Sequence, residues 1–218
     1  MPFRSRQKMG ATDPETRYHH GDLRQSLIDA ALKLIAEKQD AKTLSLREVA
    51  RRVGVSHAAP YRHFADKEAL LAAVAEEGFH ILTRHLQESM KPLEDDPLGQ
   101  LQASGVAYVK FAIAHPSHYR VMFSALQPNN PNYPALNAAG DEAFAVMVGA
   151  IAHTQTLGLV KPGDPRQLAR ITWSLVHGLA MLLIEGQLPL TDSEVVTTLA
   201  QQAAAALVYG LRQDIQGN

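Results

Sequence analysis

Polar and cationic side chains gather between Ser56 and Lys67, in the stretch SHAAPYRHFADK. Hydroxyl, phenol, imidazole and guanidinium groups can donate hydrogen bonds to phosphate oxygens and to base edges. A helix that lies in the major groove of DNA reads bases through side chains near its N-terminus, while phosphate contacts fix its position. Contact with a nucleic acid is therefore the first chemistry to consider for this stretch.

The residues just before this stretch predict the element that would position it. Ser45 and Glu48 have the spacing of a capping box, in which each side chain binds the backbone N–H of the other residue. Four apolar residues then recur at helical spacing: Leu46, Val49, Ala50 and Val53. Gly54 suits the positive φ at a helix end, and Ser56 can cap a second helix that begins at His57. Two short helices joined by a tight turn make a helix-turn-helix.

Charge is distributed unevenly along the chain of 218 residues. The net charge of −1 combines 13 Lys and Arg against 8 Asp and Glu over residues 1–67 with 8 against 14 over residues 68–218. A basic front on an acidic body is expected of a protein that binds phosphate at one end. Chance clustering is the alternative, but the basic excess coincides with the predicted helix-turn-helix.

Other kinds of chemistry find little support. The chain has no cysteine, which excludes disulfides and thiolate chemistry. It has no nucleophile elbow and no His/Asp cluster with metal spacing, so we expect no enzyme, no metal and no cofactor. The acids Asp95 and Asp96 lie between prolines and predict a turn and helix cap. Because no apolar run approaches membrane-spanning length and no signal peptide is recognisable, we expect a cytoplasmic protein without membrane contact.

No segment alternates like a strand, so the predicted fold is all-α with about nine helices. We expect a disordered basic arm over residues 1–16, a three-helix DNA-binding domain over 17–66, and a helical effector-binding and dimerisation domain over 67–218. Residues 166–186 are apolar on more than one face, which suits a helix buried between its own subunit and a partner. Residues 192–211 form a last, alanine-rich helix.

The segment PYRHFADKEALLAAV ends the second helix of the motif at a tyrosine and a histidine and begins the next helix at a lysine. It resembles the TetR (tetracycline repressor) family of one-component transcription regulators, with a good match from about Tyr18 to Val74. The candidate DNA-binding set is Arg47, Ser56, His57, Ala58, Tyr61, Arg62, His63 and Lys67. The resemblance implies phosphate contacts for Tyr61, His63 and Lys67 and base contacts for positions 56–58, and an exposed Arg47 could add a contact. Tyr61 could instead be a core aromatic.

Two features depart from the commonest family pattern. Pro60 lies in the first turn of the predicted second helix, where it removes an N–H or shifts the helix start. Ala58 and Ala59 leave few polar groups for base contacts. Thymine-methyl packing and DNA shape are therefore expected to contribute more to recognition.

In the C-terminal half, TWSLVHG resembles the Trp-x-x-x-His-Gly motif of one TetR subclass. Trp173 and His177 share a helix face, and they either line a pocket or form a packed core pair. Gly178 suggests close approach of another helix or a ligand. The candidate pocket residues are Tyr108, Phe111, Met122, Phe123, Phe144, Met147, Trp173 and His177.

The resemblance implies a homodimer formed through the last two helices, and a repressor that a small, apolar or aromatic effector releases from a palindromic operator. Three alternatives stay open: a ligand-dependent activator, a non-specific DNA binder, and a small-molecule-binding protein with an enzymatic role.

Overall fold

The computed structural model describes residues 23–127, 129–190 and 192–211. Eight α-helices lie in these ranges: α1 (Leu23–Lys38), α2 (Leu46–Val53), α3 (Lys67–Met90), α4 (Pro97–Ala114), α5 (Pro116–Arg120), α6 (Pro134–Thr156), α7 (Pro165–Ile184) and α8 (Ser193–Leu211). Three short helical segments join them: η1 (Pro60–Arg62), η2 (Lys91–Leu93) and the π-helical η3 (Val121–Ala125). The described residues contain no strand, which confirms the all-α fold class. The expected arm at 1–16 lies outside the described residues.

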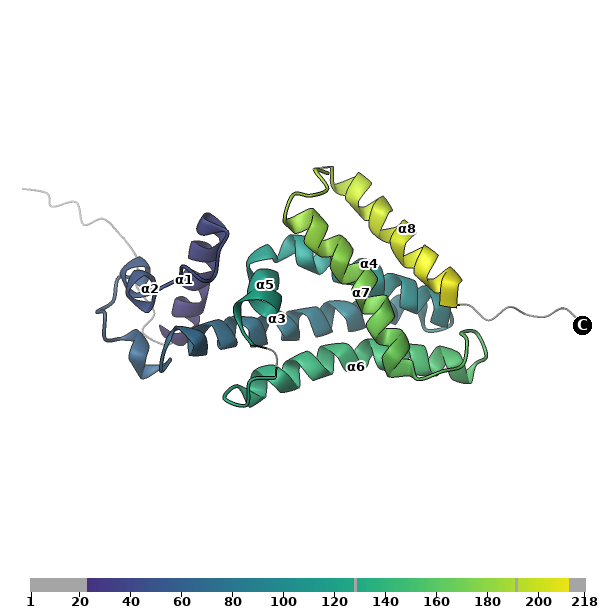
Figure 1. Cartoon of the computed structure of the whole chain (residues 1–218), viewed down its shortest axis with the longest axis horizontal. Helices are drawn as coiled ribbons and strands as arrows, with labels where there is room; N and C mark the ends of the chain where they lie inside the picture. The colour runs from purple at the N-terminus through teal and green to yellow at the C-terminus, as the bar shows by residue number, and fades with distance from the viewer. Residues whose placement is uncertain (1–22, 128, 191, 212–218) are drawn as a thin grey trace, which may run out of the picture.

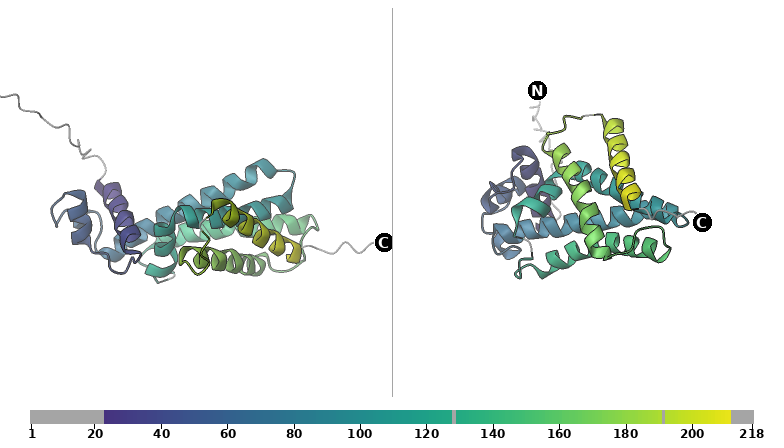
Figure 2. Two further views of the ribbon diagram at one scale, coloured as in Figure 1. Left: turned by 90° about the horizontal axis from the view of Figure 1, so that it is seen from above. Right: turned by 45° about the vertical axis from the view of Figure 1, so that its right-hand side comes forward.

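The long helix α3 connects the two ends of the molecule (Figure 1). Its first turns join α1 and α2 in one core through Leu70, Leu71 and Val74. Its later residues Leu82 and Leu86 belong to a second core with α4, α6 and α7. The expected domain boundary between residues 66 and 67 therefore falls where a helix begins that both cores share. Figure 2 shows the same arrangement, with α1 and α2 at one end and α8 toward the other.

The start and end of α2 follow from the sequence, with one difference. Ser45 Oγ accepts a hydrogen bond from the Glu48 N–H at 3.3 Å, as expected of an N-cap. The Glu48 carboxylate does not reach back to the cap, because it pairs with Lys38 at 2.6 Å. At the other end, Gly54 has φ +81°, and the Val55 N–H donates to the Ala50 carbonyl at 3.0 Å. This is a Schellman ending, which requires the left-handed conformation at Gly54.

The predicted second helix of the motif is not an α-helix, and this expectation was wrong. Residues 57–63 form turns around the single 3₁₀ turn η1. An α-helix capped by Ser56 needs a bond from the N–H of residue 60 to the Ser56 carbonyl, and Pro60 has no N–H. The Ala59 N–H donates to that carbonyl instead, at 3.0 Å, which closes a tighter turn. Pro60 itself is buried.

The C-terminal half packs around α3, with α4 and α6 against it and α7 against α4 and α6. The Asp96 carboxylate caps α4 by accepting from the Gly99 N–H at 2.9 Å, as the sequence predicts. Helix α7 has three faces. Ala169, Val176 and Ala180 are buried in the protein, whereas Ile171 and Leu175 are exposed on the opposite side. The third face lines a cavity.

By length and composition alone, α6 and α7 are each able to cross a membrane, with a hydropathy of 1.3 over the best window. This finding contradicts the expectation that no apolar run approaches that length. Core helices of soluble proteins meet the same criterion. Only 22% of the window in α6 and 28% of that in α7 is buried, so both helices keep apolar surface on the outside of the chain.

Candidate functional site

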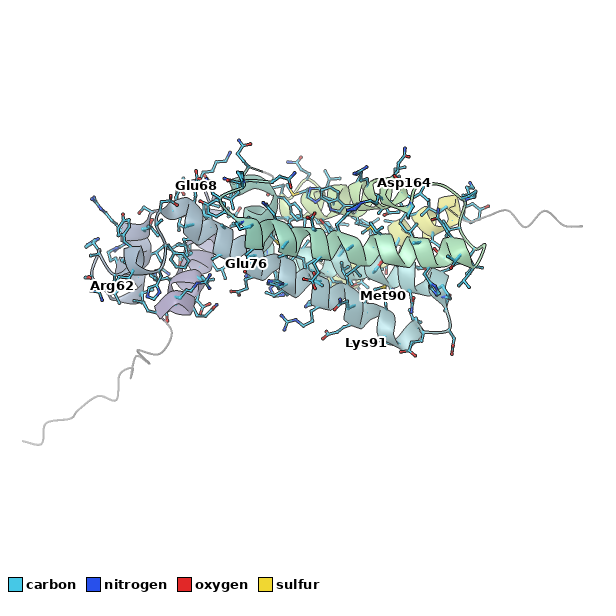
Figure 3. The ribbon with its side chains drawn as sticks, turned by 90° about the horizontal axis from the view of Figure 1, so that it is seen from below. Arg62, Glu68, Glu76, Met90, Lys91 and Asp164 are labelled. Atoms are coloured by element: carbon cyan, nitrogen blue, oxygen red, sulfur yellow. The ribbon has the colours of Figure 1, made fainter. Side chains whose placement is uncertain are left out.

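The predicted DNA-contact side chains lie on the surface at the end of the molecule formed by α2 and η1. Seven of them are exposed and Lys67 is half-buried, the full set being Arg47, Ser56, His57, Ala58, Tyr61, Arg62, His63 and Lys67. Tyr61 has 55% of its surface exposed, which rules out the core-aromatic interpretation. Figure 3 shows Arg62 at this end and Asp164 near the opposite one. The arrangement leaves a phenol, a guanidinium and imidazoles accessible to one external surface.

Not every cation of this end is available. Arg52 forms a two-pronged pair with Glu37 at 2.8 and 2.6 Å, which raises the pKa of Arg52 and lowers that of Glu37. The Arg24 guanidinium lies over the Phe64 ring, 5.5 Å from its centre. By contrast, the structure shows no ion pair for Arg47 or Arg62 within the described residues. Their charges are free to meet an anion.

Lys67 has a local partner that sequence reasoning did not foresee. Its Nζ donates to the Lys42 carbonyl at 2.9 Å and so joins the α1–α2 connection to the first turn of α3. Asp66 caps the same turn by accepting from the Ala69 N–H at 2.8 Å. An ammonium has three N–H donors, so two remain for another acceptor. Lys67 can therefore hold the loop and contact a phosphate together.

A cavity of about 590 Å³ opens in the C-terminal half between α3, α4, η3, α6 and α7. Seven of the eight predicted pocket residues line it: Tyr108, Met122, Phe123, Phe144, Met147, Trp173 and His177. Phe111 does not, and that assignment was wrong. Its ring is completely buried and packs against His85, His115 and Tyr119 in the core. Periodicity identifies Phe111 as apolar and inward-facing, but a core and a cavity wall require the same pattern.

A chain of hydrogen bonds crosses the wall of this cavity. Trp173 Nε1–H donates to Tyr108 Oη at 2.9 Å, and Tyr108 and Tyr119 hydroxyls lie 3.1 Å apart. Both hydroxyls approach His177 Nδ1, Tyr119 at 2.7 Å and Tyr108 at 3.0 Å. The direction of these bonds follows the tautomer of His177, since Nδ1 either accepts from one phenol or donates to one. The network joins α4, α5 and α7.

Burial sets the protonation state of this network. Desolvation lowers the pKa of His177, which keeps the imidazole neutral at pH 7. Desolvation also raises the pKa of Tyr108 to about 12, and raises that of Tyr119. The network of Tyr108, Tyr119, Trp173 and His177 therefore contains no ionised side chain.

Sequence reasoning missed several residues of the cavity and of the hydrogen-bond network behind it. Tyr119 does not line the cavity but completes the network and is fully buried, and no motif marks it. Arg166 and Arg170 line the cavity. Arg170 lies three residues before Trp173, and Arg166 lies four residues before Arg170. Continuing the helix face of Trp173 and His177 toward the N-terminus therefore predicts both positions.

The η3 segment lies between the cavity and the core of the DNA-contact end. Val121 is completely buried in that first core, and Met122 packs against both cores. Met122 and Leu126 also line the cavity. A π-helical turn is rare and is often found at functional sites. Any molecule that fills the cavity would touch residues that also support α1 and α3.

Two family models match the chain. One is described as bacterial regulatory proteins, tetR family, and matches residues 27–74. The other is described as a tetracyclin repressor-like C-terminal domain and matches residues 101–207. A curated protein of Haemophilus influenzae, an uncharacterized HTH-type transcriptional regulator, is 32% identical over 71 residues, or 33% of this chain and 35% of its own length.

Solved structures agree with these matches. A protein of unknown function from Rhodococcus sp. RHA1 is 34% identical, with a TM-score of 0.77 over 91% of this chain and 100% of its own. A bacterial regulatory protein in the tetR family from Rhodococcus RHA1 shares the fold at 21% identity, with a TM-score of 0.69 over 85% of this chain and 96% of its own. The chain belongs to the TetR family of DNA-binding transcriptional regulators, which are transcription factors rather than enzymes.

Proposed function

We propose that this chain is a cytoplasmic, homodimeric repressor that leaves a palindromic operator when a small apolar or aromatic effector fills the cavity. The DNA-binding part of the proposal rests on the exposed groups of α2 and η1. Tyr61, His63 and Lys67 would contact phosphates, and the turn at residues 56–58 would face the bases. Because two of the residues nearest η1 are alanines, DNA shape would carry much of the specificity.

Exposed apolar surface supports the homodimer. Ile171, Leu175 and Leu182 recur at helical spacing on the outer face of α7. Gly178 lies on the same stripe, and a Cβ added there would meet nothing within 4 Å in the described chain. The close approach that this glycine was expected to permit is thus not an approach within the subunit. We propose that α7 and α8 of a second copy cover this face, which would hold two DNA-contact ends at a fixed separation.

The observation that carries the effector part is the position of η3. Met122 and Leu126 line the cavity and also pack against the core that holds α1 and α2. A second link lies beside them: His118 Nε2 is 3.5 Å from the Glu77 carboxylate, which also accepts from Gln25 on α1 at 3.1 Å. An effector that displaces Met122 would therefore change the packing between the core that holds α1 and α2 and the core of the C-terminal half. A coupling of about 1–3 kcal/mol is sufficient for a switch.

A footprint on the DNA that flanks the coding region of this chain tests the proposal. At one fixed salt concentration, we expect a short protected site with two-fold symmetry. We also expect this protection to be lost when a metabolite fraction is added. Protection that a metabolite strengthens would favour the activator. A genome-wide pull-down without a palindrome would contradict the repressor.

The role of Lys67 can be tested with Lys67→Ala beside Lys110→Ala, which removes an exposed lysine of α4 outside the predicted DNA-binding set. Loss of one phosphate contact should weaken binding to all DNA sequences and reduce the slope of log K against log salt by about 1. Lys110→Ala should change neither quantity. Fluorescence anisotropy over a salt series measures both, and an unchanged slope for Lys67→Ala would refute the phosphate contact.

A further inference from the structure

One face of α7 runs along the cavity with a graded polarity. Arg166, Arg170, Trp173 and His177 all line it. Their spacings of four, three and four residues place them in one stripe, and a rise of 1.5 Å per residue separates the first from the last by about 16 Å along the helix. The stripe begins with two cations and ends with a neutral imidazole.

Within the part of the chain that the structure describes, the guanidinium groups of Arg166 and Arg170 have no acidic partner. The structure shows no ion pair for Arg166 or Arg170 within the described residues, and both side chains are exposed at the rim. Arg166 lies over the Phe144 ring, 6.0 Å from its centre, so its position is defined by another cavity residue. Asp164 accepts from the Arg166 backbone N–H rather than from its guanidinium. Asp141 also lines the cavity but pairs with neither arginine, which leaves a net positive charge on the described lining.

Apart from these two arginines, the described lining of the cavity contains no cationic side chain. Phe79, Leu82 and Phe123 line it beside the neutral network of Tyr108, Trp173 and His177. A carboxylate buried there would lose its hydration without gaining a counter-ion, which costs several kcal/mol or forces its protonation. An anionic group is therefore favoured at the arginine rim and disfavoured inside. Within the described residues, the structure shows no hydrogen bond to His177 Nε2, so this atom can serve an uncharged polar group.

We propose that the effector is an amphiphilic organic acid, with its carboxylate held by Arg166 and Arg170 and its apolar or aromatic body extending toward Trp173 and His177. Arginine suits this role because its planar group binds a carboxylate through two parallel hydrogen bonds. This inference rests on the proposed function, since it names the class of ligand for the same cavity.

Trp173 is the only tryptophan in the chain and lines the cavity, so its fluorescence reports occupancy. The purified full-length protein is titrated with dodecanoic acid and 1-naphthaleneacetic acid, each beside its primary amide and its alcohol, at pH 7.5. We expect the acids to bind at least tenfold more tightly than their uncharged partners. Equal affinities, or no binding of either acid at millimolar concentration, would overturn the proposal.

Three variants locate the charge selectivity. The double variant Arg166→Gln/Arg170→Gln should lose at least tenfold in affinity for the acids and keep its affinity for the amides. Asp141→Asn should bind the acids a few-fold more tightly because a repulsive charge is removed. Arg84→Gln, an exposed arginine of α3, is the matched control and should behave as wild type. Wild-type affinity of the double variant for the acids would overturn the proposal.

DNA binding without ligand separates this inference from the proposed function. A protein that protects a palindrome but binds acids and amides equally would refute the ligand class alone. A protein that binds acids selectively but protects no operator would refute the repressor alone.

Discussion

The DNA-contact end and the cavity both bring tyrosines and histidines together, yet the surroundings of these side chains differ. Tyr61 and His63 are exposed, and the structure shows no side-chain hydrogen bond for either within the described residues. Tyr119 is fully buried, with its hydroxyl 2.7 Å from His177 Nδ1 and 3.1 Å from Tyr108. The first pair has unused hydrogen-bonding capacity, and the second has most of its capacity satisfied inside the protein.

This difference indicates what each region can contribute. Exposed side chains contribute little to the free energy of unfolding, and their hydrogen-bonding groups remain available to a partner. Buried polar groups stabilise one arrangement, because each of them loses a partner if the network opens. The DNA-contact end should therefore respond to mutation in affinity, and the cavity wall should respond in stability.

The largest contrast is expected from removing each tyrosine side chain. Tyr119→Ala should lower the free energy of unfolding by about 3–5 kcal/mol, because it leaves a cavity and removes the closer of the two phenols at His177 Nδ1. Tyr61→Ala should change it by less than about 0.5 kcal/mol and weaken DNA binding. Urea unfolding at one protein concentration measures the first quantity, since a dimer's stability depends on concentration. Similar stability losses for the two variants would break the contrast.

Part of the fold that underlies this contrast could be predicted from the sequence. Ser45, the apolar spacing of α2 and Gly54 predicted α2 with its cap and its left-handed ending, because these are local properties. The replacement of a helix by η1 required knowing whether the chain around Pro60 would accept a missing N–H. Phe111 and Phe144 have the same apolar character, and only the packing of α4 and α6 separates a core residue from a cavity wall. The partners of Tyr119 depend on α4 and α7, which lie far from it in sequence.

Removing only the hydroxyl groups of Tyr119 and Tyr61 should give a smaller difference in stability between the two variants. Tyr119→Phe keeps the ring but removes the hydroxyl that lies closest to His177 Nδ1, and should cost about 1–3 kcal/mol. Tyr61→Phe should leave the unfolding free energy unchanged and reduce DNA affinity if its hydroxyl contacts a phosphate. Circular dichroism during urea unfolding and anisotropy with operator DNA measure the two effects. Undiminished stability of Tyr119→Phe would show that Tyr108 alone satisfies the imidazole.

Acid should destabilise the cavity region through its histidines. Burial lowers the pKa of His177 below its ordinary value of 6.5, so below that pH the unfolded chain binds more protons than the folded one. The contribution of His177 to stability is therefore complete above about pH 6.5 and is lost as the pH falls through the folded-state pKa. Burial lowers the pKa values of His115 and His118 as well. His177→Gln should reduce the slope of stability against pH below 6.5, and an identical slope would exclude His177 from the effect.

The smallest effect is expected at the DNA-contact end, from Pro60→Ala. The substitution supplies an N–H that can donate to the Ser56 carbonyl, which would extend η1 into an α-helical turn. It also removes part of a buried ring, so the two changes should offset each other to within about 1 kcal/mol in stability. Carbon chemical shifts of residues 57–63 should move toward helical values, and the residue-60 amide should exchange slowly. Unchanged chemical shifts would show that the missing N–H of Pro60 does not cause the 3₁₀ turn. The packing around the buried ring would then be what stabilises η1.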